Sequence, residues 1–209
     1  MKITKIFFIS FFFVSCATTM YENDLDFDLV ENFVKKNQKS DLILINIDQQ
    51  KLFFKTRFRT ISFSISSSAF GIGNKMNSFQ TPLGEHIVAE KIGEDLPLGA
   101  VLKGRKWTKE VVVPIKDVID IPEDVITSRI LWLDGVEQGI NKGGDVDSKE
   151  RFIYIHGTAE EGLIGKPASL GCIRMKNKDV IKLFNRVKEN TKVLICLLYT
   201  SDAADDLYR

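Results

Sequence analysis

The chain reads Ile153-Tyr154-Ile155-His156-Gly157-Thr158 and, shortly afterwards, Ala168-Ser169-Leu170-Gly171-Cys172-Ile173-Arg174-Met175. This stretch contains one of the two histidines and one of the three cysteines of the chain. A thiol becomes a strong nucleophile when a nearby imidazole takes its proton. Cys172 is therefore a candidate nucleophile, and His156 is its candidate base.

The neighbouring glycines fit the same chemistry. Attack on a carbonyl builds charge on its oxygen, which backbone N–H groups can stabilise. Gly171 lets the backbone approach closely, so the amides of Gly171 and Cys172 are candidate oxyanion donors. A base also needs a partner that fixes its tautomer, and the carbonyl of Gly157 is the simplest candidate. The alternative is that Cys172 only fills the core and His156 is a satisfied polar residue.

Three motifs in register carry a resemblance to a known family. They are His156-Gly157-Thr158, Ser169-Leu170-Gly171-Cys172-Ile173-Arg174 and, upstream, Thr81-Pro82-Leu83-Gly84. In order and spacing they resemble the YkuD L,D-transpeptidase catalytic-domain family, whose signature is a His-Gly segment followed by Ser/Thr-x-Gly-Cys-hydrophobic-Arg/Asn. The similarity covers residues 41–196. Leu170 departs from the pattern, because most members carry a second histidine there, and this departure bears on rate and substrate handling.

The resemblance implies a mainly β fold: a YkuD-type β-sandwich of short strands with one C-terminal helix and a long lid-like insertion. It also implies that Cys172 attacks a peptidoglycan tetrapeptide stem, releases the terminal D-Ala and passes the acyl group to an amine. The product is a 3-3 cross-link or a protein, such as a lipoprotein, anchored to the wall. No cofactor or metal is needed. The residues that this resemblance places at the substrate are Arg174, Ser169, Thr81, Pro82 and Gly84.

Three other functions remain open from the sequence. A stem-peptide hydrolase, either a carboxypeptidase or an amidase, would use the same two residues with water as the acceptor. A catalytically decayed wall-binding lipoprotein is the second, with Leu170 as the first sign of decay. A sortase-like transpeptidase also places histidine before cysteine, but the close spacing of His156 and Cys172 argues against it.

Composition narrows the class of protein. The 209 residues are 44% hydrophobic and 27% charged, which predicts one globular domain plus appendages. A net charge of +1 gives no electrostatic footprint for nucleic acid. Two histidines and no closely paired cysteines leave too few metal ligands, so His86 is expected to be structural.

The N-terminus predicts export. Residues 1–15 place two lysines before an apolar run that is too short to span a bilayer, as in a signal peptide. The run ends in Phe13-Val14-Ser15-Cys16, which resembles a lipoprotein cleavage box with Cys16 as the lipidated residue; a simple cleaved signal or an uncleaved anchor are the alternatives. Ala17 follows, and the sorting pattern of enteric bacteria then implies a periplasmic protein anchored to the outer membrane.

The remaining organisation follows from periodicity. Residues 16–40 are expected to form a tether with a short amphipathic helix, and 41–196 the catalytic domain. A helix is expected over 177–190 with Asn177 as its N-cap, and 91–124 is expected to be the lid, with Arg105 and Trp107 as candidate glycan-peptide contacts. In an oxidising compartment Cys196 could pair with Cys172. The tail at 197–209 resembles translated adapter sequence and is treated as non-native. Strands are expected at 42–47, 51–55, 60–66, 85–89, 126–133, 152–155 and 191–195.

Overall fold

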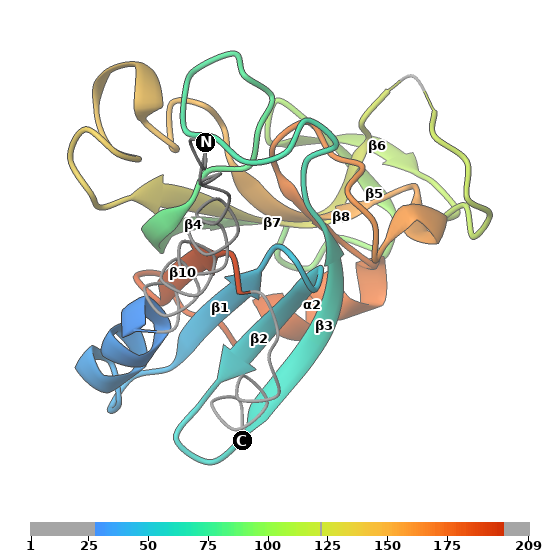
Figure 1. Cartoon of the computed structure of the whole chain (residues 1–209). Coiled ribbons are helices and arrows are strands. Elements are labelled where there is room, and N and C mark those ends of the chain that lie inside the picture. The colour runs from blue at the N-terminus through green and yellow to red at the C-terminus, as the bar shows by residue number, and fades with distance from the viewer. Residues whose placement is uncertain (1–27, 122, 199–209) are drawn as a thin grey trace, which may run out of the picture.

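The computed structural model describes residues 28–121 and 123–198, and it is mainly β, as expected (Figure 1). Ten strands form one sheet in the order β4-β10-β1-β2-β3-β9-β8-β7-β5-β6, and β4 also pairs with β7. This last pairing closes eight of the strands into a barrel and leaves β5 and β6 as an appended hairpin. The strands are β1 (Leu42–Asn46), β2 (Lys51–Lys55), β3 (Thr60–Ser66), β4 (Gly84–Ile92), β5 (Ala100–Lys103), β6 (Lys106–Val111), β7 (Ile126–Gly135), β8 (Tyr154–Thr158), β9 (Ile173–Met175) and β10 (Lys192–Cys196).

Strand β1 shows why the sheet needs two apolar layers. All five of its residues are buried, with Ile43 and Ile45 in the main core and Leu42 and Leu44 in a second cluster. Successive side chains of a strand point to opposite faces, so a continuous apolar run must be covered on both sides. The main core fills one side of the strand, and an N-terminal helix covers the other.

That helix belongs to the segment expected to be a tether. Residues 28–36 are helical, and Val30 and Phe33 are buried against Leu42, Leu44 and Leu194. Leu25, Leu29, Phe33 and Val34 are the apolar residues at helical spacing in this segment, and of these Leu29 is 40% exposed. This part of residues 16–40 is therefore packed into the domain. Leu25, the signal segment at 1–15 and Cys16 lie outside the described residues.

The domain also extends past its expected C-terminal end. Leu198 is 4% exposed within the same cluster, and its carbonyl accepts a 3.4 Å hydrogen bond from the Asn46 side chain. Residues 197 and 198 are thus part of the packed structure. The rest of the tail expected to be non-native, 199–209, lies outside the described residues.

The helix at 177–190 is shorter than expected and is capped differently. Helix α2 spans Asn177–Phe184 and has Lys176 at its N-cap, with no side-chain capping bond. The expected cap, Asn177, is instead buried, and its side chain contacts Thr127, Ser128 and the Thr158 carbonyl. The sequence pattern located the start of the helix but assigned the wrong direction to this side chain.

The region expected to be a lid contains regular structure. It holds the β5–β6 hairpin, and Val101 of β5 pairs with Thr127 of β7. Arg105 lies at the hairpin turn, with its guanidinium carbon 4.5 Å from the ring centroid of Trp132. Two short 3-10 turns, η1 (Gly144–Val146) and η2 (Glu161–Leu163), complete the elements. No helix among the described residues is both long and apolar enough to cross a bilayer.

Candidate active site

The parallel pair β8–β9 brings the two candidate catalytic residues to one face of the sheet. His156 pairs with Arg174, and Ile155 pairs with Ile173. Because side chains alternate along a strand, Ile155 and Ile173 enter the main core while His156 and Arg174 point to the opposite face. Cys172 lies directly before β9. Because it is two residues from Arg174 along an extended segment, its side chain points to the same face.

His156 is held in one tautomer. Its Nδ1 lies 2.8 Å from the carbonyl oxygen of Gly157, which can only accept, so Nδ1 carries the proton. Nε2 is left as the basic nitrogen. The side chain is fully buried, and Nε2 has no hydrogen-bond partner among the described residues. Burial lowers the pKa of His156, while the charge of Asp124 and the Gly157 carbonyl act in the opposite direction.

Cys172 is a free, partly exposed thiol that packs beside an apolar cluster. Its Sγ accepts from the Tyr154 N–H and donates to the Phe152 carbonyl, both at 3.4 Å. Burial raises the pKa of the thiol to about 12; the charge of Asp124 adds to this shift, and the Tyr154 N–H opposes it. The thiol and the imidazole are therefore both neutral at neutral pH in this structure. Cys196 lies in a different cluster, on β10, so the two cysteines do not face one another.

The turn before Cys172 is fixed by hydrogen bonds. Ser169 Oγ donates to the Cys172 carbonyl at 2.6 Å and accepts from the Gly171 N–H at 3.2 Å. Thr81 Oγ1 donates to the Gly171 carbonyl at 3.1 Å. Gly171 has φ +118, a conformation that side-chain-bearing residues rarely adopt. The Gly171 amide is thus already engaged by Ser169, which would have to release it for the amide to bind an oxyanion.

The other residues expected at the substrate have structural contacts. Pro82 is buried, and Gly84 begins β4 with φ +101, where a Cβ would lie 2.2 Å from Glu137 Oε2. Arg174 is 2% exposed, with ion pairs to Glu160 at 2.9 Å and to Asp124 at 3.1 Å. Through these contacts Arg174 joins β9 to the segments that contain Asp124 and Glu160.

His86 is also built into the fold. It is fully buried on β4, with one ring nitrogen 2.9 Å from Ser148 Oγ and the other 3.0 Å from the Gly84 carbonyl. Among the residues that the structure describes, no group of three or more His, Cys, Asp or Glu side chains is arranged to hold a metal ion.

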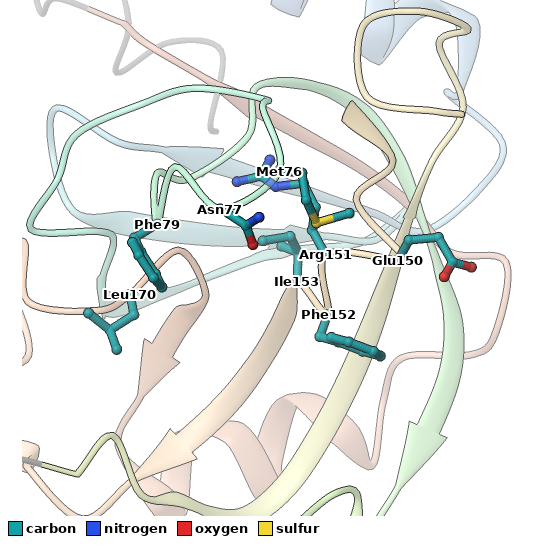
Figure 2. Close-up of a pocket in the computed structure, with 8 residues that line it drawn as sticks. All are labelled: Met76, Asn77, Phe79, Glu150, Arg151, Phe152, Ile153 and Leu170. Atoms are coloured by element: carbon teal, nitrogen blue, oxygen red, sulfur yellow. The ribbon is translucent and has the colours of Figure 1, made fainter. Parts of the chain in front are cut away.

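A cavity of about 260 Å³ adjoins the nucleophile turn, and sequence reasoning missed it (Figure 2). Leu170, two residues before Cys172, forms part of its wall and is 50% exposed. Arg151 also lines the cavity and is the arginine among its lining residues. In the sequence it is only one more charged residue. The lining residues are Met76, Asn77, Phe79, Glu150, Arg151, Phe152, Ile153 and Leu170.

Fold and site together define a β-barrel domain that carries a histidine on β8 and a cysteine directly before the neighbouring strand β9. The model of the YkuD family, described as an L,D-transpeptidase catalytic domain, matches residues 40–195, and the chain belongs to this family.

Known relatives share shorter segments. A putative L,D-transpeptidase YqjB of Bacillus subtilis is 46% identical over 54 residues, which are 25% of this chain and 31% of that protein. A putative L,D-transpeptidase YkuD of the same organism is 56% identical over 48 residues, 23% of this chain and 29% of that protein. The alignments thus span about a third of the length of these relatives.

Solved structures of L,D-transpeptidases are also similar. The C442S mutant of the Enterococcus faecium enzyme has 17% identity and a TM-score of 0.45, covering 75% of this chain and 49% of that one. L,D-transpeptidase 3 from Mycobacterium tuberculosis, in complex with a faropenem-derived adduct, has 14% identity and a TM-score of 0.46, covering 75% and 60%.

Proposed function

We propose that the protein is a peptidoglycan L,D-transpeptidase in which Cys172 forms a thioester with a tetrapeptide stem. One observation carries the proposal: the buried His156 Nε2, which has no hydrogen-bond partner among the described residues, lies on the same sheet face as the Cys172 thiol, with Nδ1 fixed by the Gly157 carbonyl. A basic nitrogen that is free to accept a proton can act as the base for a thiol on the same face. Family membership supplies the class of substrate.

In the first half-reaction, the thiol proton moves to His156 Nε2 and the sulfur attacks the carbonyl between the third and fourth stem residues. The C–N bond then breaks, and His156 returns the proton to the leaving amine of D-Ala. In the second, an acceptor amine attacks the thioester and gives its proton to His156, and the thiolate leaves and takes that proton back. The Cys172 thiol donates to the Phe152 carbonyl, so it must first rotate away from that carbonyl to give its proton to His156. Such a change is common, because catalytic hydrogen bonds often form fully only when substrate is bound.

The acceptor separates this function from two others. A stem diamino acid gives a 3-3 cross-link, and a lysine of a lipoprotein gives a wall-anchored protein. Water would make the same site a stem-peptide hydrolase. The exposed Leu170 beside the nucleophile keeps a decayed, wall-binding lipoprotein as the third candidate.

The test is to incubate the purified chain with disaccharide-tetrapeptide and to follow intact protein and products by mass spectrometry. We expect an adduct equal to the stem without D-Ala, absent in Cys172→Ala and retained in the matched variant Cys196→Ala. Cross-linked dimers would support the transpeptidase, whereas shortened stems alone would support the hydrolase. No adduct under reducing conditions, together with its appearance in Leu170→His, would mean that the site has decayed.

We also propose that the protein is periplasmic and is anchored to the outer membrane through a lipid on Cys16. The proposal is supported by the lysines, apolar run and cleavage-box pattern of residues 1–16. Cys16→Ser should then move the protein from the membrane fraction to the soluble periplasmic fraction. An unchanged membrane fraction would refute lipid anchoring at this residue.

A further inference from the structure

Among the described residues, the guanidinium of Arg151 has no ion-pair partner. It donates to the carbonyls of Gly73 at 3.2 Å and Gln80 at 2.7 Å, and to Ser78 Oγ at 3.3 Å. All three acceptors are neutral. Across residues 28–121 and 123–198, no carboxylate lies within ion-pair distance of Arg151. A partly buried arginine is ordinarily paired with an acid, because desolvating a charge is costly.

Other buried arginines of this protein lie near acids. Arg174 has two carboxylate partners. Arg129 has no ion pair among the described residues, but the negative charges of Asp95 and Glu94 oppose the lowering of its pKa by burial.

Burial lowers the pKa of Arg151 as well, and the charge that opposes this shift is that of the Cys172 thiolate and not that of a carboxylate. Arg151 also lines the same cavity as Phe152 and Leu170, which places its guanidinium on the side of the nucleophile turn.

The surroundings of Arg151 show what kind of anion would fit. The cavity of about 260 Å³ is lined by apolar side chains together with Asn77, Glu150 and Arg151. Two of the apolar residues, Leu170 and Phe79, are 50% and 53% exposed. Its acid, Glu150, points away from the other lining side chains (Figure 2). A guanidinium combined with apolar walls complements a small ligand that carries both a carboxylate and an apolar side chain.

The cavity is also in the right place for a group attached to the reacting carbonyl. Phe152, which lines it, accepts a hydrogen bond from the Cys172 thiol through its carbonyl, and Leu170 is two residues from the same cysteine. In a peptide, the carboxylate of a terminal residue lies only three bonds from the carbonyl carbon of the residue before it. A carboxylate held by Arg151 would thus belong to the residue that leaves.

We propose that this cavity binds the C-terminal residue of the donor peptide, with Arg151 donating to its free carboxylate and with Leu170 and Phe79 packing against its side chain. The inference rests on the proposed acyl transfer at Cys172. Arg151 is then the residue that makes the enzyme specific for donors ending in a free acid. The carboxylate stays ionised throughout, and the C–N bond that breaks is the one described above.

The test compares two synthetic donors, a tetrapeptide with a free C-terminal carboxylate and its C-terminal carboxamide. The readout is kcat/KM for acylation of Cys172 in the full chain, measured on the intact protein. Wild type should prefer the acid by about 10- to 100-fold, the range expected for hydrogen bonds to a charged group. Arg151→Met should lower the rate with the acid to the level of the carboxamide and change the carboxamide rate by less than about threefold.

Two further variants separate recognition from a structural role. Arg151→Lys keeps the charge but loses the planar fork, so it should retain part of the preference for the acid. Arg129→Met removes another buried arginine outside the cavity and should leave the preference unchanged. Thermal unfolding of each variant checks that the barrel is intact.

Two results would overturn the inference while leaving the proposed function standing. One is equal acylation of wild type by both donors. The other is an equal loss with both donors in Arg151→Met, which would mean that Arg151 only clamps the loop containing Gly73 and Gln80. If neither donor acylates wild type, the proposed function fails, and the subsite fails with it.

Discussion

Replacing Arg174 by methionine should strongly destabilise the barrel. The substitution keeps the volume of the side chain but leaves the carboxylate of Glu160, which is fully buried, without its 2.9 Å ion pair. Removing one partner of a buried ion pair typically costs about 3–5 kcal/mol. In a domain of this size each kcal/mol shifts the midpoint of thermal unfolding by about 2–4 °C, so a loss of roughly 6–20 °C is expected.

The loss should depend on pH in a defined direction. Burial raises the pKa of Glu160, and the charge of Arg174 opposes this shift, so Arg174→Met should raise the pKa further. An acid whose pKa is higher in the folded state than in the unfolded state stabilises the fold at low pH, and this contribution is lost as pH rises through the folded pKa. The variant should therefore be less impaired at pH 5 than at pH 7.

Equilibrium unfolding in urea measures both effects, and a double variant supplies the control. Glu160→Gln in the Arg174→Met background removes the unpaired charge, so it should recover at least half of the lost free energy. A loss below about 1 kcal/mol that does not change with pH would refute the reasoning, because it would mean that water or another group compensates Glu160.

Three other perturbations follow from single contacts. Gly157→Ala should lower the rate of Cys172 acylation and cost about 1–3 kcal/mol of unfolding free energy, because its Cβ would lie 2.6 Å from the Thr127 carbonyl oxygen; wild-type values in both assays would contradict this. Alkylation of Cys172 by iodoacetamide should rise about tenfold per pH unit between pH 7 and 10, because burial raises the thiol pKa to about 12. An alkylation rate that stops rising below pH 8 would contradict this, because it would show that Cys172 is already a thiolate. Phe33→Ala should lower the free energy of unfolding in urea by about 3–5 kcal/mol, because Phe33 is 2% exposed. An unchanged free energy of unfolding would mean that residues 28–36 act only as a tether.

The strands were predictable where the pattern is local. Residues 60–66 alternate apolar residues with serine and threonine, and the structure places β3 over this range. The hairpin of β1 and β2 follows from two short apolar runs around a polar turn. Closure of the barrel was not predictable, because the β4–β7 pairing joins residues far apart in the sequence and leaves no local signal.

The direction in which individual side chains point could also not be predicted from the sequence. Asn177 precedes an apolar periodic run, and that pattern is the same whether the side chain caps its own helix or turns inward. Thr127 and Ser128 determine the direction, because both hydroxyls donate to the side-chain oxygen Oδ1 of Asn177 at 2.6 Å. Arg151 could not be singled out for a related reason: in the sequence it is one charge among several, and only the folded loop shows that its acceptors within the described part of the chain are neutral.

Asp124 connects the stability of the barrel to the proposed chemistry. Its charge raises the pKa of both His156 and Cys172, so it favours a protonated imidazole and a neutral sulfur. Before attack this field opposes the thiolate, consistent with a thiol that is neutral at rest. After attack the negative charge has moved from sulfur to the carbonyl oxygen, while the proton remains on His156 until the amine leaves. Under the proposed mechanism Asp124 therefore favours the protonated His156 that both half-reactions pass through, and its ion pair with Arg174 at 3.1 Å holds it in place.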